Sequence, residues 1–223
     1  MPLHDLHLKI SSNKNTLTLE ALEFKGCQGK AQINGHITAN PFSTSLAYAY
    51  NNINLEQMLQ DSIGPQGASG FISTSGIANF NGDSLEQMLY SLEINGKILA
   101  QNVMIDNLSI DDLSQKQLNQ NLDLNDYSSS GQTECNNIQS DLSIKRGNIK
   151  LENITLDTRN TTAKGSAQID LYQLAINAQL LFDLQGKSRP NYQNPLQLEL
   201  KISQHLFNPV KVLRIVDPLA TNK

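Results

Sequence analysis

Hydrophobic and polar residues alternate along most of this chain. Leu6, Leu8 and Ile10 are separated by polar residues, and the same pattern recurs at intervals up to residue 202. Alternation with a period of two is typical of antiparallel strands that bury one face and leave the other wet. We therefore expect strands near residues 6–10, 17–24, 31–37, 71–76, between 92 and 110, and at 142–144, 149–151, 154–156, 167–169, 175–184 and 196–202.

One phrase occurs twice in the sequence. Residues 96–106 (GKILAQNVMID) and 147–157 (GNIKLENITLD) place glycine, aliphatic residues, asparagine and aspartate at the same offsets, and residues 15–25 form a weaker third copy. Because asparagine tolerates turn geometry, each phrase predicts a strand–turn–strand unit, and Asn95 followed by Gly96 adds another turn signal. Repeated units favour architectures built by placing like units side by side. The predicted fold class is mainly β, an antiparallel, curled, repeat-built sheet (an open groove or half-barrel) with two or three short helices.

Two short helices are predicted from a shared pentapeptide, LEQML, at residues 55–59 and 85–89. Asn54 and Ser84 are suitable N-cap residues, and Ser84 with Gln87 has the spacing of a capping box. The apolar residues of both helices would share one face and are expected to pack in the core. These residues are Leu55, Met58, Leu59, Leu85, Met88 and Leu89.

We expect residues 1–223 to form a single β domain. Residues 115–139 are rich in Gln, Asn, Asp and Ser and have little to bury, which predicts a flexible polar insertion within that domain. A boundary between two subdomains at the same place is the alternative. Either way, each half of the chain carries one copy of the strong phrase.

The composition restricts the function classes. Only 17% of the 223 residues are charged and the net charge of −4 is spread along the chain, which disfavours nucleic acid as a partner. The sequence contains no apolar run of about 18 residues and no signal peptide, so the chain is expected to be either cytoplasmic or part of a longer protein. Cys27 and Cys135 would form one disulfide in an oxidising compartment or act as small buried hydrophobes; the sequence leaves both readings open.

The sequence carries no motif that predicts catalysis. It contains no HExxH, GxSxG, phosphate-loop or calcium-loop pattern, and its two cysteines lack the spacing of a metal site. Trp is missing and the Phe and Tyr residues are scattered, so no aromatic platform for sugars or bases is expected. We therefore predict a protein that is not an enzyme and uses no cofactor or metal.

The repeated phrases, with the pattern G-x-h-x-x-x-N-h-x-h, resemble strand pairs in the C-terminal region of the AsmA family. The matching segments follow the family's order along nearly the whole chain: residues 29–35, 53–59, 70–108, 133–171 (with 165–169), 195–209 and 217–218. Cys135 stands where the family usually has a buried Phe. The resemblance therefore implies that Cys135 is a core residue rather than half of a disulfide.

The resemblance implies a periplasmic domain, tethered to the inner membrane of a Gram-negative cell by an N-terminal anchor missing from this chain. It also implies a role in outer-membrane biogenesis, either through phospholipid transport or through assembly of outer-membrane proteins. The partners would be phospholipid acyl chains or envelope-assembly proteins. An interaction or scaffold module that uses exposed β-edges without binding lipid is the alternative.

A curled sheet with an aliphatic inner face would shield acyl chains at about 0.8 kcal/mol per buried CH₂. We assign this lipid-groove lining to the aliphatic positions of the two phrases and their neighbours. The predicted lining residues are Ile94, Ile98, Val103, Ile105, Ile144, Ile149, Ile154 and Leu156. The rival reading is that the same residues pack against the two helices as a closed core.

Overall fold

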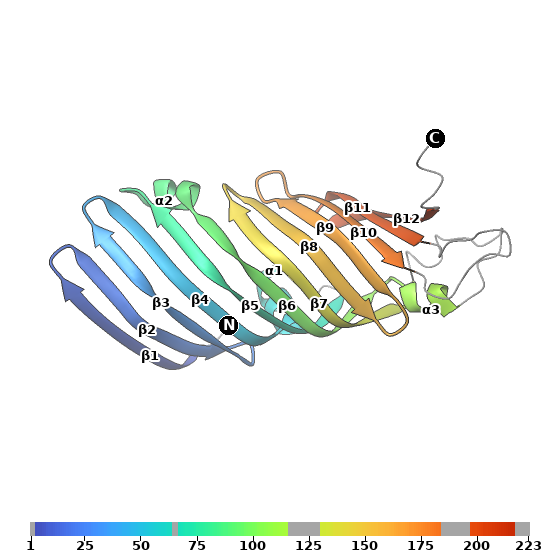
Figure 1. The fold of residues 1–223 in the computed structure, drawn as a ribbon, viewed down its shortest axis with the longest axis horizontal. Helices are drawn as coiled ribbons and strands as arrows, with labels where there is room; N and C mark the ends of the chain where they lie inside the picture. The colour runs from blue at the N-terminus through green and yellow to red at the C-terminus, as the bar shows by residue number, and fades with distance from the viewer. Residues whose placement is uncertain (1–2, 64–66, 116–129, 184–196, 217–223) are drawn as a thin grey trace.

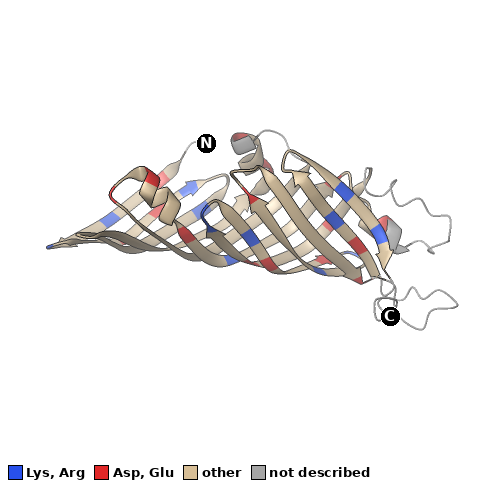
Figure 2. Cartoon of the chain, turned by 90° about the horizontal axis from the view of Figure 1, so that it is seen from above, with Lys and Arg blue, Asp and Glu red and all other residues tan. Residues whose placement is uncertain are grey.

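Twelve strands form one antiparallel sheet in the computed structural model, which describes residues 3–63, 67–115, 130–183 and 197–216 (Figure 1). The strands are β1 His4–Asn13, β2 Thr16–Gly26, β3 Gly29–Ala39, β4 Phe42–Asn54, β5 Ala68–Asn81, β6 Glu93–Asp106, β7 Gln132–Lys145, β8 Asn148–Thr158, β9 Thr162–Asp170, β10 Ala175–Asp183, β11 Gln197–His205 and β12 Asn208–Val216. Each strand pairs with its neighbours in the sequence, so β1 and β12 are the two edges. The predicted fold class is confirmed, including the open, curled sheet (Figure 2).

Three short helices lie in connections between strands: α1 Leu55–Ile63, α2 Leu85–Ser91 and α3 Ile110–Gln115. Both predicted N-caps are confirmed, because the side-chain oxygens of Asn54 and Ser84 accept hydrogen bonds from the N–H groups three residues later. The capping box is only partly formed. The Gln87 side chain accepts a hydrogen bond from the N–H of Asp83, at 2.8 Å, one residue before the N-cap.

The connections fall on two opposite rims of the sheet. The turns after β1, β3, β7, β9 and β11 lie on one rim together with α2, whereas α1, α3 and the turns after β2 and β8 lie on the other (Figure 1). This arrangement follows directly from a sheet in which every strand reverses the direction of the one before it. Helix α1 contacts β4 and β5, and its Leu55 packs against the buried core.

The repeated phrase adopts a different local structure from the one predicted. The first copy lies within β6, and the second lies within β8 except for Gly147, which is in the turn before that strand. In both copies the asparagine forms a β-bulge rather than a turn between two strands. Asn102 and Asn153 have left-handed φ angles of 51° and 52°, and Asn52 in β4 repeats this geometry with a φ of 60°. Asparagine is suited to both settings because it tolerates positive φ. The Asn95 and Gly96 turn signal is also wrong, since both residues pair within β6.

The register gives the sheet one apolar face and one polar face. Residues opposite each other in an antiparallel pair share a face, so each row of partners runs across the sheet on one side. One apolar row is Leu19, Gly35, Leu46, Ala78, Ile94, Ile144, Ile149, Ile169 and Ile176. The neighbouring polar row is Thr18, His36, Ser45, Asn79, Glu93, Lys145, Asn148 and Asp170.

The buried core lies on the apolar face at the α3 end of the sheet. Its members come from β6 through β12 and from the start of α3: Ala100, Val103, Leu108, Ile110, Cys135, Leu156, Ala163, Phe182, Leu198, Leu200 and Leu213. A single sheet buries residues from so many strands only by curling around them, so the apolar face is the concave one. Lys211 of β12 lies on this face, and its Nζ donates an exposed hydrogen bond to the Asn107 carbonyl oxygen at 3.3 Å.

Burial decreases toward the N-terminal edge. Every residue of β1 is exposed, including Leu8 and Ile10, whereas the inward residues of β2 to β5 are mostly half-buried. The predicted core role of α2 is wrong, because Leu85 and Leu89 are 72% and 59% exposed. The corresponding prediction for α1 is confirmed for Leu55, which packs against the core cluster, while Met58 and Leu59 are partly buried.

The predicted polar insertion at 115–139 is too long. Strand β7 begins at Gln132, and its residues up to Gln139 pair with β6. Residues 116–129 lie outside the described residues, as do residues 195–196 and 217–218 of the matching segments. Cys27 and Cys135 are both buried thiols, and Cys135 belongs to the core cluster.

Candidate ligand-binding face

The concave apolar face is the candidate functional surface. We define it by the apolar row given above and by the other rows whose side chains point to the same side of the sheet. The next row toward the α1 rim is Leu22, Ile33, Tyr48, Gly76, Gly96, Leu142, Leu151, Ala167, Ala178, Ile202 and Lys211. Among the paired positions of the described strands, Lys211 is the one charged residue on this face.

The structure places all eight predicted lining residues on the apolar face of three adjacent strands. Ile94, Ile144 and Ile149 are direct partners across β6, β7 and β8. Ile98 shares the face of Ile94 by plain alternation, and the bulges at the repeated asparagines keep the residues after them on the same side, because a bulge shifts the alternation by one residue. Ile98 lies opposite Ser140, Val103 opposite Cys135, Ile105 opposite Thr133, Ile154 opposite Gly165, and Leu156 opposite Ile138.

Burial divides these eight residues into two groups. Val103 and Leu156 are each 4% exposed and belong to the core cluster beside α3, and Ile105 packs against that cluster. Ile154 is buried as well, at the β8 bulge. The four remaining residues, Ile94, Ile98, Ile144 and Ile149, are half-buried and lie outside the cluster. The first group packs as closed core, whereas the second leaves aliphatic surface accessible.

An aromatic group on the same face escaped the sequence analysis. The ring centroids of Phe24 and Tyr50 lie 6.2 Å apart in an edge-to-face arrangement, and those of Tyr48 and Tyr50 lie 5.9 Å apart. Burial raises the pKa of Tyr50 above its usual value, and the neighbouring Tyr48 adds to this shift. The sequence signal for this aromatic group was the pair of tyrosines at alternate positions, Tyr48 and Tyr50, with Ala49 between them. The expectation that the aromatic residues are scattered is therefore wrong for these three.

Several hydroxyl groups on the apolar face are buried without a hydrogen-bond partner. They are Tyr48 Oη, Thr74 Oγ1 and Thr44 Oγ1. Most buried polar groups in proteins are paired, and an unpaired one costs about 1–3 kcal/mol. These atoms are polar points on a surface that is otherwise hydrocarbon.

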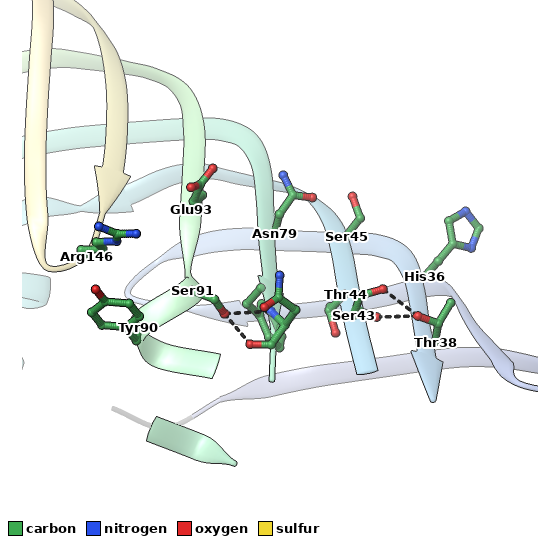
Figure 3. Close-up of a pocket in the computed structure, with 12 residues that line it drawn as sticks. His36, Thr38, Ser43, Thr44, Ser45, Asn79, Tyr90, Ser91, Glu93 and Arg146 are labelled. Carbon is green, nitrogen blue, oxygen red and sulfur yellow. Dashed lines mark hydrogen bonds between the residues drawn. The ribbon is translucent and has the colours of Figure 1, made fainter. Parts of the chain in front are cut away.

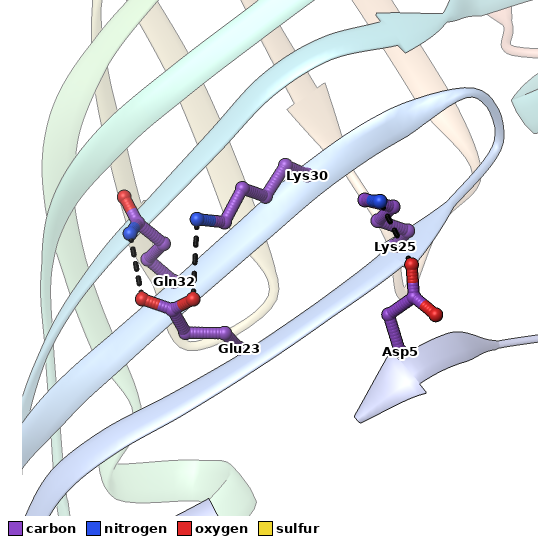
Figure 4. A network of polar contacts seen from close by, with 5 residues as sticks. All are labelled: Asp5, Glu23, Lys25, Lys30 and Gln32. Carbon is purple, nitrogen blue, oxygen red and sulfur yellow. Dashed lines mark hydrogen bonds and ion pairs between the residues drawn. The ribbon is translucent and has the colours of Figure 1, made fainter. Parts of the chain in front are cut away.

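Side chains on the polar face of β1 to β3 pair with one another. Asp5 pairs with Lys25 at 2.7 Å, and Glu23 contacts both Lys30 at 3.1 Å and Gln32 at 2.9 Å (Figure 4). The hydrogen bond and charge of Lys25 lower the pKa of Asp5. Such exposed pairs contribute little to stability and keep the outer face hydrated.

A shallow hollow of about 660 Å³ lies on the polar face beside α2 (Figure 3). His36, Ser45 and Asn79 point into the same region from three neighbouring strands. The hollow ends at Tyr90, whose ring centroid lies 4.9 Å from the guanidinium carbon of Arg146. Two of its hydroxyl contacts lie within the rim: Ser91 Oγ donates to the Asn81 carbonyl oxygen, and the Thr38 and Ser43 hydroxyl groups bond to each other. We find no arrangement of nucleophile and base among these lining residues.

The described residues contain no group of three His, Cys, Asp or Glu side chains that could hold a metal ion. Over the same part of the chain, each helix is too short or too polar to cross a bilayer. Comparison with protein-family models, with curated proteins and with solved structures finds no match to this chain.

Proposed function

We propose that this chain is a non-enzymatic lipid-binding domain whose concave apolar face shields acyl chains. The observation that carries the proposal is a continuous apolar face across twelve strands, with Lys211 as its one charge among the paired positions. Its second layer is incomplete among the described residues, because the main contacts of α1 are with β4 and β5 and those of α3 are with β7. Aliphatic surface left without a covering layer is favourably covered by another apolar group.

The apolar side chains of this face are most exposed at its N-terminal end. Leu8 and Ile10 of β1 are each more than half exposed, although the adjacent strand continues the same apolar rows. Each methylene transferred from water to such a surface contributes about 0.8 kcal/mol, so even a partly shielded acyl chain would gain several kcal/mol. A ligand with long hydrocarbon chains matches this extended, weakly charged surface better than a compact polar metabolite does.

The resemblance to AsmA-like proteins extends the proposal to a cellular setting. In that setting the domain is periplasmic and belongs to an inner-membrane-anchored protein. Its role is in outer-membrane biogenesis, with phospholipid transport favoured over outer-membrane protein assembly. The apolar, concave face supports the lipid-handling branch of this proposal, since a pure scaffold has no need of uncovered aliphatic rows on its inner side.

Lipid extraction from protein purified without detergent tests the proposal. We expect reproducible co-purification of diacyl phospholipid, identified by mass spectrometry. A photo-reactive benzoylphenylalanine in place of Ile98 should crosslink to that lipid, whereas the same group in place of the adjacent Lys97, on the polar face, should not. Equal crosslinking at both positions, or a protein that carries no lipid and takes none from vesicles, would sink the proposal.

The second candidate function is strand addition at the β1 edge. All ten residues of β1 are exposed, and its outer edge has no partner strand among the described residues. Exposed edges of this kind can accept an extended segment of another protein. A protein adduct captured through a reactive group at Ser11, together with lipid-free purified chain, would favour this function over lipid binding.

A further inference from the structure

Two hydroxyl groups near the middle of the apolar face have no partner. Tyr48 Oη and Thr74 Oγ1 are both buried, and neither donates nor accepts a hydrogen bond. Both residues lie on the apolar face: Tyr48 is opposite Gly76, and Thr74 is opposite Ile98. Each position would accept an apolar residue of the same shape, phenylalanine or valine, at no loss of packing. The hydroxyl groups therefore call for an explanation other than the packing of the sheet.

A pair of glycines places the Tyr48 hydroxyl at the centre of the face. Gly76 and Gly96 are direct partners on β5 and β6, and a Cβ built on Gly96 would lie 2.8 Å from Tyr48 Oη. The phenol ring thus lies across bare backbone, and its hydroxyl reaches two strands away from its own. Thr74 is two residues from Gly76 along β5, so its hydroxyl belongs to the same central region.

The chemistry of the two groups limits the ligand. Both can donate a hydrogen bond to a neutral oxygen, and both are surrounded by hydrocarbon. A phosphate headgroup would require cations, but the one cation at the paired positions of this face is Lys211, on the far edge strand β12. The oxygens that accompany acyl chains without a charge are the ester carbonyls of a glycerolipid. An ester carbonyl accepts hydrogen bonds and donates none, which matches two donors with no acceptor partner.

We propose that Tyr48 and Thr74 donate hydrogen bonds to the ester carbonyl oxygens of a glycerolipid whose acyl chains lie on the apolar face. This inference rests on the proposed lipid-binding function and adds the part of the lipid that is recognised. The two side chains are only partly buried, although their oxygens are covered. For a ligand to reach the Tyr48 oxygen, the phenol ring has to leave only backbone at Gly96, because no side chain holds its hydroxyl there.

The test compares an ester lipid with its ether analogue, which lacks the carbonyl oxygens. The chain is incubated with vesicles of equal parts dioleoyl phosphatidylcholine and the corresponding ether-linked dialkyl lipid. It is then separated by flotation, and its bound lipids are quantified by mass spectrometry. We expect the wild type to retain about tenfold more ester than ether lipid, and Tyr48→Phe and Thr74→Val each to lower that ratio about threefold.

Matched controls separate recognition from structure. Thr44→Val removes a hydroxyl that is also unpartnered but lies in a residue only 4% exposed, and Tyr90→Phe removes an exposed one on α2. Both should keep the wild-type ratio. The Tyr48 and Thr74 variants should also unfold at the same or a higher urea concentration, since each loses an unsatisfied group; marked destabilisation would overturn the inference.

The outcomes distinguish the two proposals. If the wild type retains both lipids equally, or if the variants keep the ester preference, the inference about the carbonyls is wrong while lipid binding stands. If the wild type retains neither lipid, both proposals fall. A preference that disappears in the double variant, with the total lipid bound nearly unchanged, supports both.

Discussion

Leu156→Ala and Ile149→Ala form a pair of substitutions that measures how far the core extends along the apolar face. Both residues lie in β8 on the same face and belong to the repeated phrase. Both substitutions remove the same number of carbon atoms. Leu156 is 4% exposed and belongs to the core cluster, whereas Ile149 is half-buried near the opposite rim. The two substitutions therefore remove equal volumes from unequal environments.

The expected losses follow from this difference in burial. Three buried carbon groups contribute about 2.4 kcal/mol by transfer, and the cavity beside Phe182 and α3 adds to this, so Leu156→Ala should cost about 3–4 kcal/mol. Ile149 loses roughly half of that transfer free energy and leaves no enclosed cavity, so Ile149→Ala should cost about 1 kcal/mol. The difference of about 2 kcal/mol is larger than the usual error of such measurements.

Urea unfolding followed by far-ultraviolet circular dichroism provides the measurement, because the chain has no Trp to report fluorescence. Lipid must first be removed, since a ligand that binds only the folded chain would raise the apparent stability of every variant. Equal losses for the two variants would refute the reasoning. They would mean that the apolar face is closed over Ile149 and offers no accessible lining there.

Other predictions concern charge, backbone geometry and thiol reactivity. Burial raises the pKa of Glu199, but the hydrogen bonds and charges of Arg214 and Lys201 outweigh this effect and lower the pKa overall. The wild type should therefore lose stability toward urea as the pH falls below about 4.5. The Arg214→Gln variant should lose less stability over the same range. Asn102→Val should cost about 1–2 kcal/mol in urea unfolding because its φ is 51°, whereas Asn102→Gly should be nearly neutral. Burial raises the pKa of the Cys135 thiol to about 12, so a thiol reagent at neutral pH should modify it only as fast as the chain unfolds.

The sequence predicted the strands whose two faces differ strongly. Strand β2 is such a case, because Leu17, Leu19 and Phe24 alternate with polar residues. Strand β4 was missed because its outward positions include Ala47 and Ala49, which weaken the contrast with the inward tyrosines. The asparagines of the repeated phrase were assigned to turns, whereas their left-handed backbone belongs to bulges. Pairing on both sides of β6 determines that it is a bulge, and single-sequence patterns do not contain that pairing.

The sequence predicted on which face of the sheet the site residues lie, but not how deeply they are buried. Ile98 and Val103 share one face as the sequence analysis predicted, but through the bulge at Asn102 and not through the predicted turn, since alternation alone would place residues five apart on opposite faces. Whether either residue is core depends on the curl of the sheet and on α3, which brings Ile110 against Val103 and its neighbours. Helix α2 also shows that the sequence pattern did not determine burial, because its apolar residues were predicted to be buried and are exposed. An amphipathic pattern requires a surface to pack on, and Leu85 has none among the described residues.

The composition of the apolar rows explains why one face serves both as core and as a candidate binding surface. Toward β12 the rows carry large residues such as Phe182 and Leu200, which lie on neighbouring strands and belong to the buried core cluster. Toward β1 the rows combine the glycines Gly35, Gly76 and Gly96 with the aromatic residues Tyr48 and Tyr50, and none of these residues belongs to the buried core cluster. If the N-terminal strands curled as tightly as the C-terminal ones, they would enclose a cavity, which costs free energy in proportion to its volume. The sheet therefore remains open where the core cluster ends, and this open part is where an apolar ligand would lower the free energy of the fold.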